Sequence, residues 1–265
     1  MRKVIIQGLV ILILFFGALF TLRQIDWMSL FKVEQATKKT EEILGDLFWK
    51  IYNESEDEIN NPYIKSVIDS IVTKICIEND LDRNHIQLHI INKKDINAFA
   101  LPNGHLVIYK GLILASENQE EVAGVIGHEI AHIELNHVMQ KLVKEVGLSM
   151  LISMTTGSGN SESIKETIQI LSSTAFDRIL EKDADIKAVD YLIEAKINSE
   201  PFANFLYRLS DSDSEITKYL TWARTHPESK ERAEYIIEYI KDKATVNEPV
   251  LRKQTWEKLI EKIQE

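Results

Sequence analysis

The sequence predicts a mainly helical α+β domain with a small antiparallel β-sheet. From residue 26 onward most apolar side chains recur at intervals of three and four, which is the spacing of amphipathic helices. Two short stretches differ: residues 86–90 alternate apolar and polar side chains, and residues 97–109 have the pattern of a hairpin. The chain has 265 residues, 45% hydrophobic and 27% charged, which suffices for one large domain or two small ones.

Charge and cysteine content exclude two kinds of partner and site. The formal net charge is −10, whereas binding to nucleic acid requires a concentrated cationic surface, so we expect no nucleic-acid partner. Cys76 is the only cysteine, so the chain has no internal disulfide and no cluster of thiolates for a metal. Any metal site must therefore be built from histidine and carboxylate side chains.

An apolar run near the N-terminus predicts a single membrane span. Residues 4–22 carry no charge and follow Arg2 and Lys3; as a helix they cover about 28 Å, close to the roughly 30 Å of a bilayer core. A cleaved signal peptide has a similar pattern, but no small-x-small cleavage site follows this run. We expect residues 1–25 to be an uncleaved anchor with the following domain outside the cytoplasm, whereas cleavage would give a secreted or periplasmic protein.

The rest of the chain divides into a stalk and a main domain. Residues 26–59 have helical spacing between positions 43 and 52 and predict a stalk helix, and residues 60–265 form the main domain. Asn61-Pro62 is a helix start, with a helix to about residue 80. An apolar helix at 146–156 and a mobile glycine- and serine-rich loop at 157–161 follow the hairpin. Further helices are predicted at 162–175, 178–195, 200–210, 213–224, 228–241 and 248–263.

The strands offer a candidate binding edge. The first strand of the hairpin ends in Pro102, so it suits the edge of a sheet. An exposed edge can bind an extended peptide by backbone pairing, although a hairpin that only covers the core explains the pattern equally well. In the earlier strand we expect His89 to face solvent. The residues of the candidate edge are Asn97, Ala98, Phe99 and Ala100.

The strongest chemical signal is His128-Glu129-Ile130-Ala131-His132, within an apolar helical stretch. Histidines four positions apart lie one turn apart on the same helical face, so both can bind one metal ion. Glu129 lies about 100° round the helix, where it can contact a water at the metal without binding the metal itself. This arrangement is half of a zinc site, because such a site needs a third protein ligand and leaves the fourth position to water.

Carboxylates elsewhere in the sequence are candidates to complete the site. Glu181 and Asp185 are four positions apart on a predicted helix, so Glu181 can bind zinc while Asp185 accepts a hydrogen bond from a ligand histidine. Glu121 is seven positions before His128 and nearly in line with it, which allows a supporting role behind the ligands. Its place in the first turn of a helix that starts with a Ser116 capping box is the simpler explanation.

These segments resemble a family of zinc metallopeptidases that includes the bacterial HtpX protease, the CAAX prenyl endopeptidase, the Oma-type mitochondrial protease and BepA. The resemblance covers most of the chain from about residue 60 to 241. It rests on residues 97–111, on 121–137, on the segment from Arg178 to Asp185, and on Thr225-His226-Pro227 with Arg232.

The resemblance implies a zincin-like metalloprotease fold of the single-anchor or periplasmic branch, one Zn²⁺ per chain and a polypeptide substrate. It also implies a role for each residue that matches a family motif. His128, His132 and Glu181 would be zinc ligands, Glu129 the catalytic base and Asp185 the support of a ligand, while His226 and Arg232 would face the substrate or the oxyanion.

The sequence therefore predicts a membrane-anchored zinc endopeptidase that hydrolyses peptide bonds of protein substrates, with a role in quality control of membrane or envelope proteins. Two other classes stay open. One is a zinc-stabilised, membrane-associated chaperone or binding module with little turnover, in which His226 or the loop at 157–161 blocks the metal. The other is a zinc hydrolase that does not act on peptides. Glu129 favours an enzyme, because a scaffold needs no base beside its metal.

Overall fold

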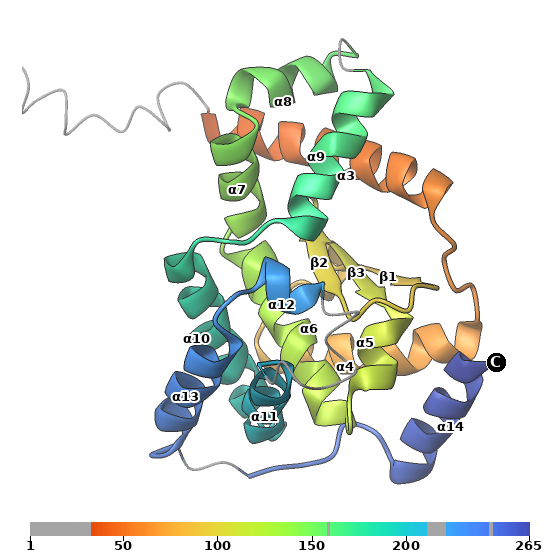
Figure 1. Cartoon of the computed structure of the whole chain (residues 1–265), viewed down its shortest axis with the longest axis vertical. Coiled ribbons are helices and arrows are strands. Elements are labelled where there is room, and N and C mark those ends of the chain that lie inside the picture. The colour runs from red at the N-terminus through yellow and green to blue at the C-terminus, as the bar shows by residue number, and fades with distance from the viewer. Residues whose placement is uncertain (1–32, 158–159, 211–220, 244–245) are drawn as a thin grey trace, which may run out of the picture. The chain divides into compact units, whose positions relative to one another are not determined.

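The computed structural model describes residues 33–157, 160–210, 221–243 and 246–265 (Figure 1). The chain divides into two compact units, residues 1–41 and 42–265, and the larger one carries the candidate site. As predicted, the described chain is mainly helical with one small sheet. The helix expected as a stalk is α3 (Val33–Ser55), which belongs to the larger unit from Glu42 onward.

Several sequence predictions fall wholly or partly outside the described residues. The anchor expected at residues 4–22 is one of them. Among the helices that are described, none combines the length and the apolar character needed to cross a membrane. The loop expected at 157–161 is described only in part, and of the helix expected at 213–224 the structure describes α12 (Trp222–Thr225).

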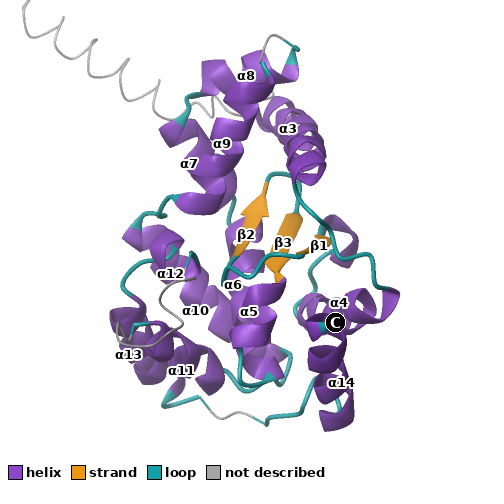
Figure 2. Cartoon of the chain, turned by 45° about the vertical axis from the view of Figure 1, so that its right-hand side comes forward, coloured by secondary structure: helices purple, strands orange, loops and turns teal. Residues whose placement is uncertain are grey.

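The sheet contains β1 (Gln87–Ile91), β2 (Ala98–Leu101) and β3 (His105–Tyr109) in the order β1-β3-β2 (Figure 2). β2 and β3 form the predicted antiparallel hairpin, but β1 pairs parallel with β3, so the sheet is mixed. The reason is that the chain reverses at residues 92–97 and leaves room for one strand between β1 and β2. β3 fills that room and runs in the direction of β1.

The helices of the larger unit mostly match the predicted segments. Asn61 caps its helix as expected, since its side chain accepts hydrogen bonds from the backbone N–H groups of Tyr63 and Ile64. The short helix after the hairpin and the break at Asn136, which has a φ of 58°, are not visible in the apolar spacing. The remaining helices are α4 (Pro62–Glu78), α5 (Lys110–Ala115), α6 (Gln119–Glu134), α7 (His137–Glu145), α8 (Leu148–Thr155), α9 (Ser161–Ser173), α10 (Arg178–Glu194), α11 (Glu200–Leu209), α13 (Ser229–Ile240) and α14 (Lys253–Gln264).

α6 is the central helix and packs against α10, α11 and β2. Its start differs from the prediction: Asn118, not Ser116, caps it by accepting a hydrogen bond from the backbone N–H of Glu121 at 2.9 Å. Ser116 instead donates to the carbonyl of Leu112 at 2.9 Å. α6 is buried on nearly all sides, which explains why it is apolar around its circumference.

Two glycines on α6 allow a matched test of how closely its neighbours approach. A Cβ atom at Gly124 would lie 2.6 Å from Cγ of Phe202 in α11, whereas one at Gly127 would lie 3.7 Å from Cβ of Ala188 in α10. We expect Gly124→Ala to lower the free energy of unfolding by about 1–3 kcal/mol through overpacking. Gly127→Ala should raise it by up to about 1 kcal/mol through helix propensity. Urea unfolding of both variants checks this, and equal effects would contradict the close approach at Gly124.

The prediction that His89 faces solvent is wrong. His89 is 8% exposed because Trp49 of α3 stacks on its ring, with ring centroids 3.4 Å apart. Its Nε2 lies 2.9 Å from Nδ1 of His105, which is also buried. Burial lowers the pKa of His89 to about 3 and that of His105 to about 4, so both are neutral near pH 7. α3 therefore covers a face of the sheet that we expected from the sequence to be exposed to solvent.

Candidate metal centre and active site

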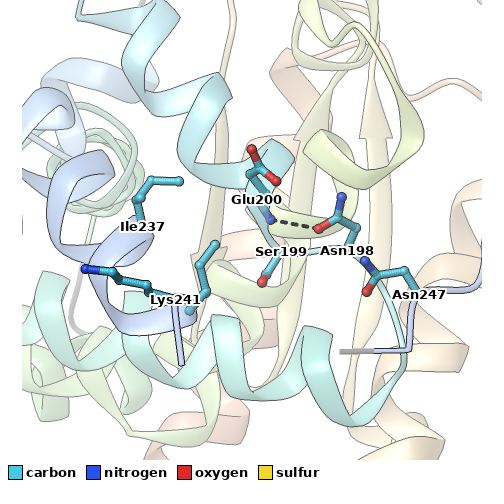
Figure 3. A pocket seen from close by; sticks show the side chains of 7 residues that line it. Asn198, Ser199, Glu200, Ile237, Lys241 and Asn247 are labelled. Carbon is cyan, nitrogen blue, oxygen red and sulfur yellow. Dashed lines mark hydrogen bonds between the residues drawn. The ribbon is translucent and has the colours of Figure 1, made fainter. Parts of the chain in front are cut away.

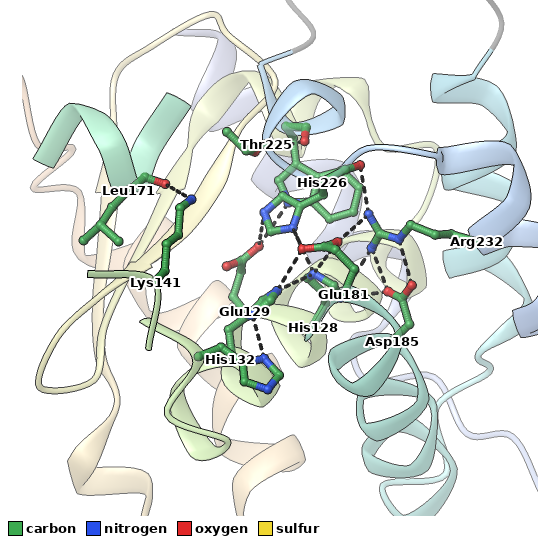
Figure 4. Close-up of polar contacts among 12 residues, drawn as sticks. His128, Glu129, His132, Lys141, Leu171, Glu181, Asp185, Thr225, His226 and Arg232 are labelled. Carbon is green, nitrogen blue, oxygen red and sulfur yellow. Dashed lines mark hydrogen bonds and ion pairs between the residues drawn. The ribbon is translucent and has the colours of Figure 1, made fainter. Parts of the chain in front are cut away.

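The candidate site lies where α6 packs on α10, close to the segment that contains α12 (Figure 4). α6 presents its two histidines one turn apart, as helical spacing requires. All the site residues predicted on these helices are at most 2% exposed, so the site is closed to solvent. They are His128, Glu129 and His132 from α6, Glu181 and Asp185 from α10, His226 directly after α12, and Arg232 from α13.

Four side chains converge on one point, each with one potential ligand atom, and these atoms lie within 4.8 Å of one another: His128, His132, Glu181 and His226. His128 Nε2 is 3.0 Å from His132 Nε2 and 3.1 Å from His226 Nδ1. Glu181 Oε1 is 2.8 Å from His226 Nδ1 and 3.4 Å from His132 Nε2. These residues are up to 98 positions apart in the sequence, and the packing of the helices brings them together.

The protonation of the histidines shows whether a cation fits. His128 Nδ1 lies 2.8 Å from a carboxylate oxygen of Asp185, so it carries the proton and leaves Nε2 with a lone pair toward the convergence point. His132 Nδ1 lies 3.0 Å from His137 Nδ1. When His132 Nδ1 donates its proton to His137, Nε2 of His132 has a lone pair toward the same convergence point. Nitrogen lone pairs and a carboxylate that face one point favour a cation, and nitrogen and oxygen ligands suit Zn²⁺. The residues therefore fit zinc.

Two residues contact the candidate ligand histidines from behind, and only one of these contacts was predicted from the sequence. Asp185 lies where predicted, beside His128. His137 orients His132 from behind. Its position five residues after His132 gave no helical signal, because α6 ends between them.

His226 lies at the convergence point itself. The sequence placed it beside the substrate, whereas here its Nδ1 is within reach of both His128 and Glu181. Its Nε2 is buried without a hydrogen-bond partner among the described residues and is 3.4 Å from Oε1 of Glu129. The structure thus offers four protein ligands where a catalytic zinc site uses three.

Glu129 is held by a residue that the sequence analysis missed. The indole N–H of Trp222 donates a hydrogen bond of 3.0 Å to Glu129 Oε1. The other oxygen, Oε2, is buried without a hydrogen-bond partner among the described residues. Trp222 also stacks on the ring of His226, with centroids 4.7 Å apart. Its position four residues before His226, on the same helical face, was the only signal available.

Arg232 binds the carboxylates of α10. Its Nε and Nη2 donate to the two oxygens of Asp185, both at 2.7 Å, and its Nη1 lies 2.9 Å from Oε2 of Glu181. It also donates to the carbonyl of His226 at 2.9 Å. Burial would raise the pKa of Asp185, but the charge and hydrogen bonds of Arg232, together with the hydrogen bond from His128, outweigh burial and hold that pKa below its usual range. The guanidinium is thus engaged within the protein, and its contacts favour a supporting position over one that faces an oxyanion.

Glu121 lies elsewhere than predicted. Both of its carboxylate oxygens contact Arg208 of α11, and one also accepts a hydrogen bond from the backbone N–H of Glu117 at 2.8 Å. These contacts fasten the first turn of α6 to α11, and among the described residues none joins Glu121 to the histidines. Glu121 lies on the same face of α6 as His128, because seven residues are close to two full turns. The same two turns place it roughly 10 Å from His128 along the helix axis.

β2 is at the edge of the sheet, as predicted, but all four of its residues are buried. α9 packs against it, and Asn97, directly before β2, donates a hydrogen bond of 3.3 Å to the carbonyl of Ser172 at the end of α9. In the described chain, residues 98–101 make backbone hydrogen bonds to β3 alone. The outer edge is therefore unpaired but covered, and not exposed as the sequence suggested.

A buried lysine fastens the segment after α9 over the site. Lys141 of α7 donates to the carbonyls of Leu171 and Thr174, at 3.5 and 2.5 Å. Its ammonium lies 4.0 Å above the ring of Phe176, which stacks on His132 with centroids 4.1 Å apart. Burial lowers the pKa of Lys141 to about 8, so it is mostly charged at pH 7. Residues 171–176 thus form part of the wall that closes the site.

A pocket of about 340 Å³ opens elsewhere on the surface (Figure 3). None of the residues that line it belongs to the metal group, so it is not an entrance to the candidate site. Its polar groups are already engaged in part, since Asn198 accepts a hydrogen bond from the backbone N–H of Glu200. The lining residues are Asn198, Ser199, Glu200, Ile237, Ile240, Lys241 and Asn247.

Fold and site together define a zinc metallopeptidase: a helix carries His-Glu-x-x-His, a second helix supplies the glutamate, and a small sheet lies beside them. The pattern of the family described as Peptidase family M48 matches residues 58–240, and the chain belongs to this family.

Named relatives agree with this assignment. A beta-barrel assembly-enhancing protease of Yersinia pestis is 23% identical over 196 residues, covering 69% of this chain and 40% of the relative. The mitochondrial metalloendopeptidase OMA1 of Bos taurus is 27% identical over 178 residues, with coverage of 61% and 34%. The metalloprotease YcaL of Escherichia coli K12 is 27% identical over 171 residues, with coverage of 62% and 66%. The chain thus spans less than half the length of the first two.

Proposed function

We propose that this chain is a zinc-dependent endopeptidase that hydrolyses peptide bonds within protein substrates. The observation that carries the proposal is the position of Glu129. Its Oε1 is held by Trp222, its buried Oε2 is without a hydrogen-bond partner among the described residues, and the neighbouring side chains offer nitrogen and oxygen ligands for one zinc ion. A purely structural zinc site has no need of such a carboxylate.

Each residue of the candidate site has a separate role in the proposed hydrolysis. Zinc, when bound by His128, His132 and Glu181, supplies a Lewis acid that lowers the pKa of water and polarises a carbonyl. Glu129 accepts the proton of the attacking water at Oε2 and passes it to the leaving amine. The Trp222 N–H keeps Oε1 engaged, so the carboxylate stays in one orientation. Asp185 holds the proton on Nδ1 of His128, and Arg232 holds Asp185.

The substrate is proposed to bind as an extended strand. Residues 98–100 of β2 offer backbone groups on the unpaired edge, and an extended peptide added there is presented close to α6, which packs against β2. α9 must move away first, since it covers this edge. A substrate that must be extended suits unfolded or partly unfolded polypeptides.

The proposed setting is quality control of membrane or envelope proteins. Two observations support this setting. The names of two relatives refer to assembly of β-barrels and to mitochondria, and the apolar run at residues 4–22 is one that we propose as a single membrane anchor. The domain would then lie outside the cytoplasm.

One observation favours a second candidate, a zinc-stabilised binding module with little turnover. With His226 among the ligands the group has four protein atoms, which is typical of closed structural zinc sites. His226 then takes the position that water needs. The two functions differ in whether this position can open.

Hydrolysis of unfolded casein tests the choice. We expect the wild type to cleave casein, cleavage to stop with a zinc chelator and to return with added zinc, and His226→Ala to cleave faster because it frees a ligand position. Zinc content should remain near one per chain in both proteins. If both proteins bind zinc and neither cleaves casein, the binding module is the correct function.

A further inference from the structure

Residues 171–176 run from the edge strand of the sheet to the candidate metal group. We name this segment, which is the end of α9 and part of the connection to α10, the strap. Near its start the carbonyl of Ser172 accepts a hydrogen bond of 3.3 Å from the side chain of Asn97, directly before β2. At its end the ring of Phe176 stacks on His132, with centroids 4.1 Å apart. The two ends of the strap thus lie where the proposed substrate would pair and where it would be cleaved.

One buried cation holds the strap in this place (Figure 4). Lys141 of α7 is 4% exposed, and its ammonium donates to the carbonyls of Leu171 and Thr174. These carbonyls lie at the C-terminal end of α9, where carbonyls lack partners within the helix and the helix dipole favours a cation. The same ammonium lies 4.0 Å from the centroid of the Phe176 ring. One side chain therefore contacts both the helical part of the strap and the ring that covers His132.

The other contacts of the strap are weaker. In the described chain, the hydrogen bonds that join the strap to other elements, apart from those of the lysine, connect neutral groups. They are the bond from Asn97 and a bond of 3.2 Å from the backbone N–H of Phe176 to the carbonyl of Thr225. Hydrogen bonds of an ionised group are roughly twice as strong as neutral ones, so the ammonium makes the strongest polar contacts of the strap. Residues 173–175 are exposed, so the strap can move outward without disrupting the core.

We propose that the strap is an autoinhibitory segment and that Lys141 is the positioning residue that keeps it closed. In the closed state α9 covers the edge of β2 and Phe176 covers His132. When the lysine releases the strap, the edge and the metal group become accessible together, because the strap connects them. The proposal concerns regulation of the proposed peptidase and rests on that function for its effect on proteolysis. The opening itself is measured without proteolysis.

Lys141→Met in the full-length, zinc-loaded protein tests the role of the lysine. Methionine fills much of the same space but donates no hydrogen bond to the strap. Lys144→Met is the matched control, because Lys144 lies on the same helix and pairs at 2.7 Å with Asp177, directly after the strap, but both side chains are more than half exposed. Two rates report opening: the loss of zinc to excess EDTA, and hydrogen–deuterium exchange of the strap amides by mass spectrometry. Exchange of α4, in the core, reports unfolding of the whole unit.

We expect Lys141→Met to lose zinc and to exchange the strap amides roughly 10- to 100-fold faster than the wild type, which is the effect of removing a hydrogen bond to a charged group. Exchange of α4 should stay unchanged, and Lys144→Met should equal the wild type in every rate. The value of kcat/KM for casein should rise in Lys141→Met alone. If the two opening rates rise as expected while no protein cleaves casein, the strap controls access to the metal and the proposed peptidase function is wrong.

Two results would overturn the role of Lys141. One is a Lys141→Met protein whose opening rates equal those of the wild type, and the other is an equal increase in Lys144→Met. If Lys141→Met does not fold, the wild type decides. Its strap should exchange at least about 100-fold faster than α4, as expected for a local opening. Exchange of both segments at the same rate would show that the strap opens only when the whole unit unfolds, which overturns the proposal.

Discussion

Glu129→Gln should abolish proteolysis and leave zinc binding intact. Glutamine has nearly the same shape as glutamate and its amide oxygen can still accept the hydrogen bond that Trp222 now donates to Oε1 at 3.0 Å. It cannot accept a proton at neutral pH, so the loss isolates the base. General acid–base catalysis contributes on the order of 10²- to 10⁴-fold, and we expect a loss of this size in kcat/KM for casein with one zinc per chain retained.

The control for this variant is Glu134→Gln, on the same helix. Glu134 is exposed at the end of α6 and is not part of the metal group, so its substitution removes the same charge without touching the site. Activity should equal that of the wild type. A Glu129→Gln protein that cleaves casein at the wild-type rate would remove Glu129 from the mechanism, and loss of zinc from it would make Glu129 a ligand.

Trp222→Phe asks what the indole N–H contributes. Phenylalanine retains a ring beside His226 but lacks the donor for Glu129, so the fold and the zinc content should persist while kcat falls more than KM changes. We expect a decrease of roughly 10- to 100-fold, because one hydrogen bond to a charged group contributes about 1.5–3 kcal/mol. Steady-state kinetics with zinc analysis measure this, and unchanged kcat would show that the hydrogen bond does not position the base.

Part of the candidate metal group was accessible from sequence because helical spacing is a local property. Spacing alone places His128 and His132 one turn apart, and Glu181 and Asp185 one turn apart on another helix, whereas the choice of Glu181 as a candidate ligand also depended on the histidine motif. His226 and Trp222 are about 90 residues from α6, and their place at the site depends on how α12 packs, which no periodicity encodes. Without the family resemblance His226 had no signal beyond a histidine before a proline.

The sheet shows a similar division between local and distant information. The hairpin of β2 and β3 was predicted because its turn is local, whereas the parallel pairing of β1 with β3 depends on a long-range choice of neighbours. Exposure was the weakest part of the prediction. β2 was correctly placed at the edge, but the sequence could not reveal that α9, more than 60 residues later, covers it, or that Trp49 covers His89.

Arg232→Met should cause the largest loss of stability among substitutions at the site. Arg232 is 2% exposed and is the cation that Asp185 contacts with both oxygens, while Oε2 of Glu181 lies 2.9 Å from Nη1. Methionine fills similar space but leaves two buried carboxylates without this partner. Breaking a buried ion pair in this way costs about 3–5 kcal/mol, so we expect a decrease of this size in the free energy of unfolding. Urea unfolding in the presence of chelator measures it without a contribution from zinc.

Two further variants separate the ion pair from other causes. Lys144→Met removes an exposed cation that pairs with Asp177 at 2.7 Å, and it should leave the unfolding curve unchanged, because surface pairs contribute little. Adding Asp185→Asn to Arg232→Met should restore part of the stability, since the double variant no longer buries the aspartate charge. Two results would contradict this role of Arg232. One is an unfolding curve of Arg232→Met that equals that of Lys144→Met. The other is a double variant that is less stable than Arg232→Met by as much as Asp185→Asn alone destabilises the wild type, which would show that Arg232 and Asp185 are not coupled.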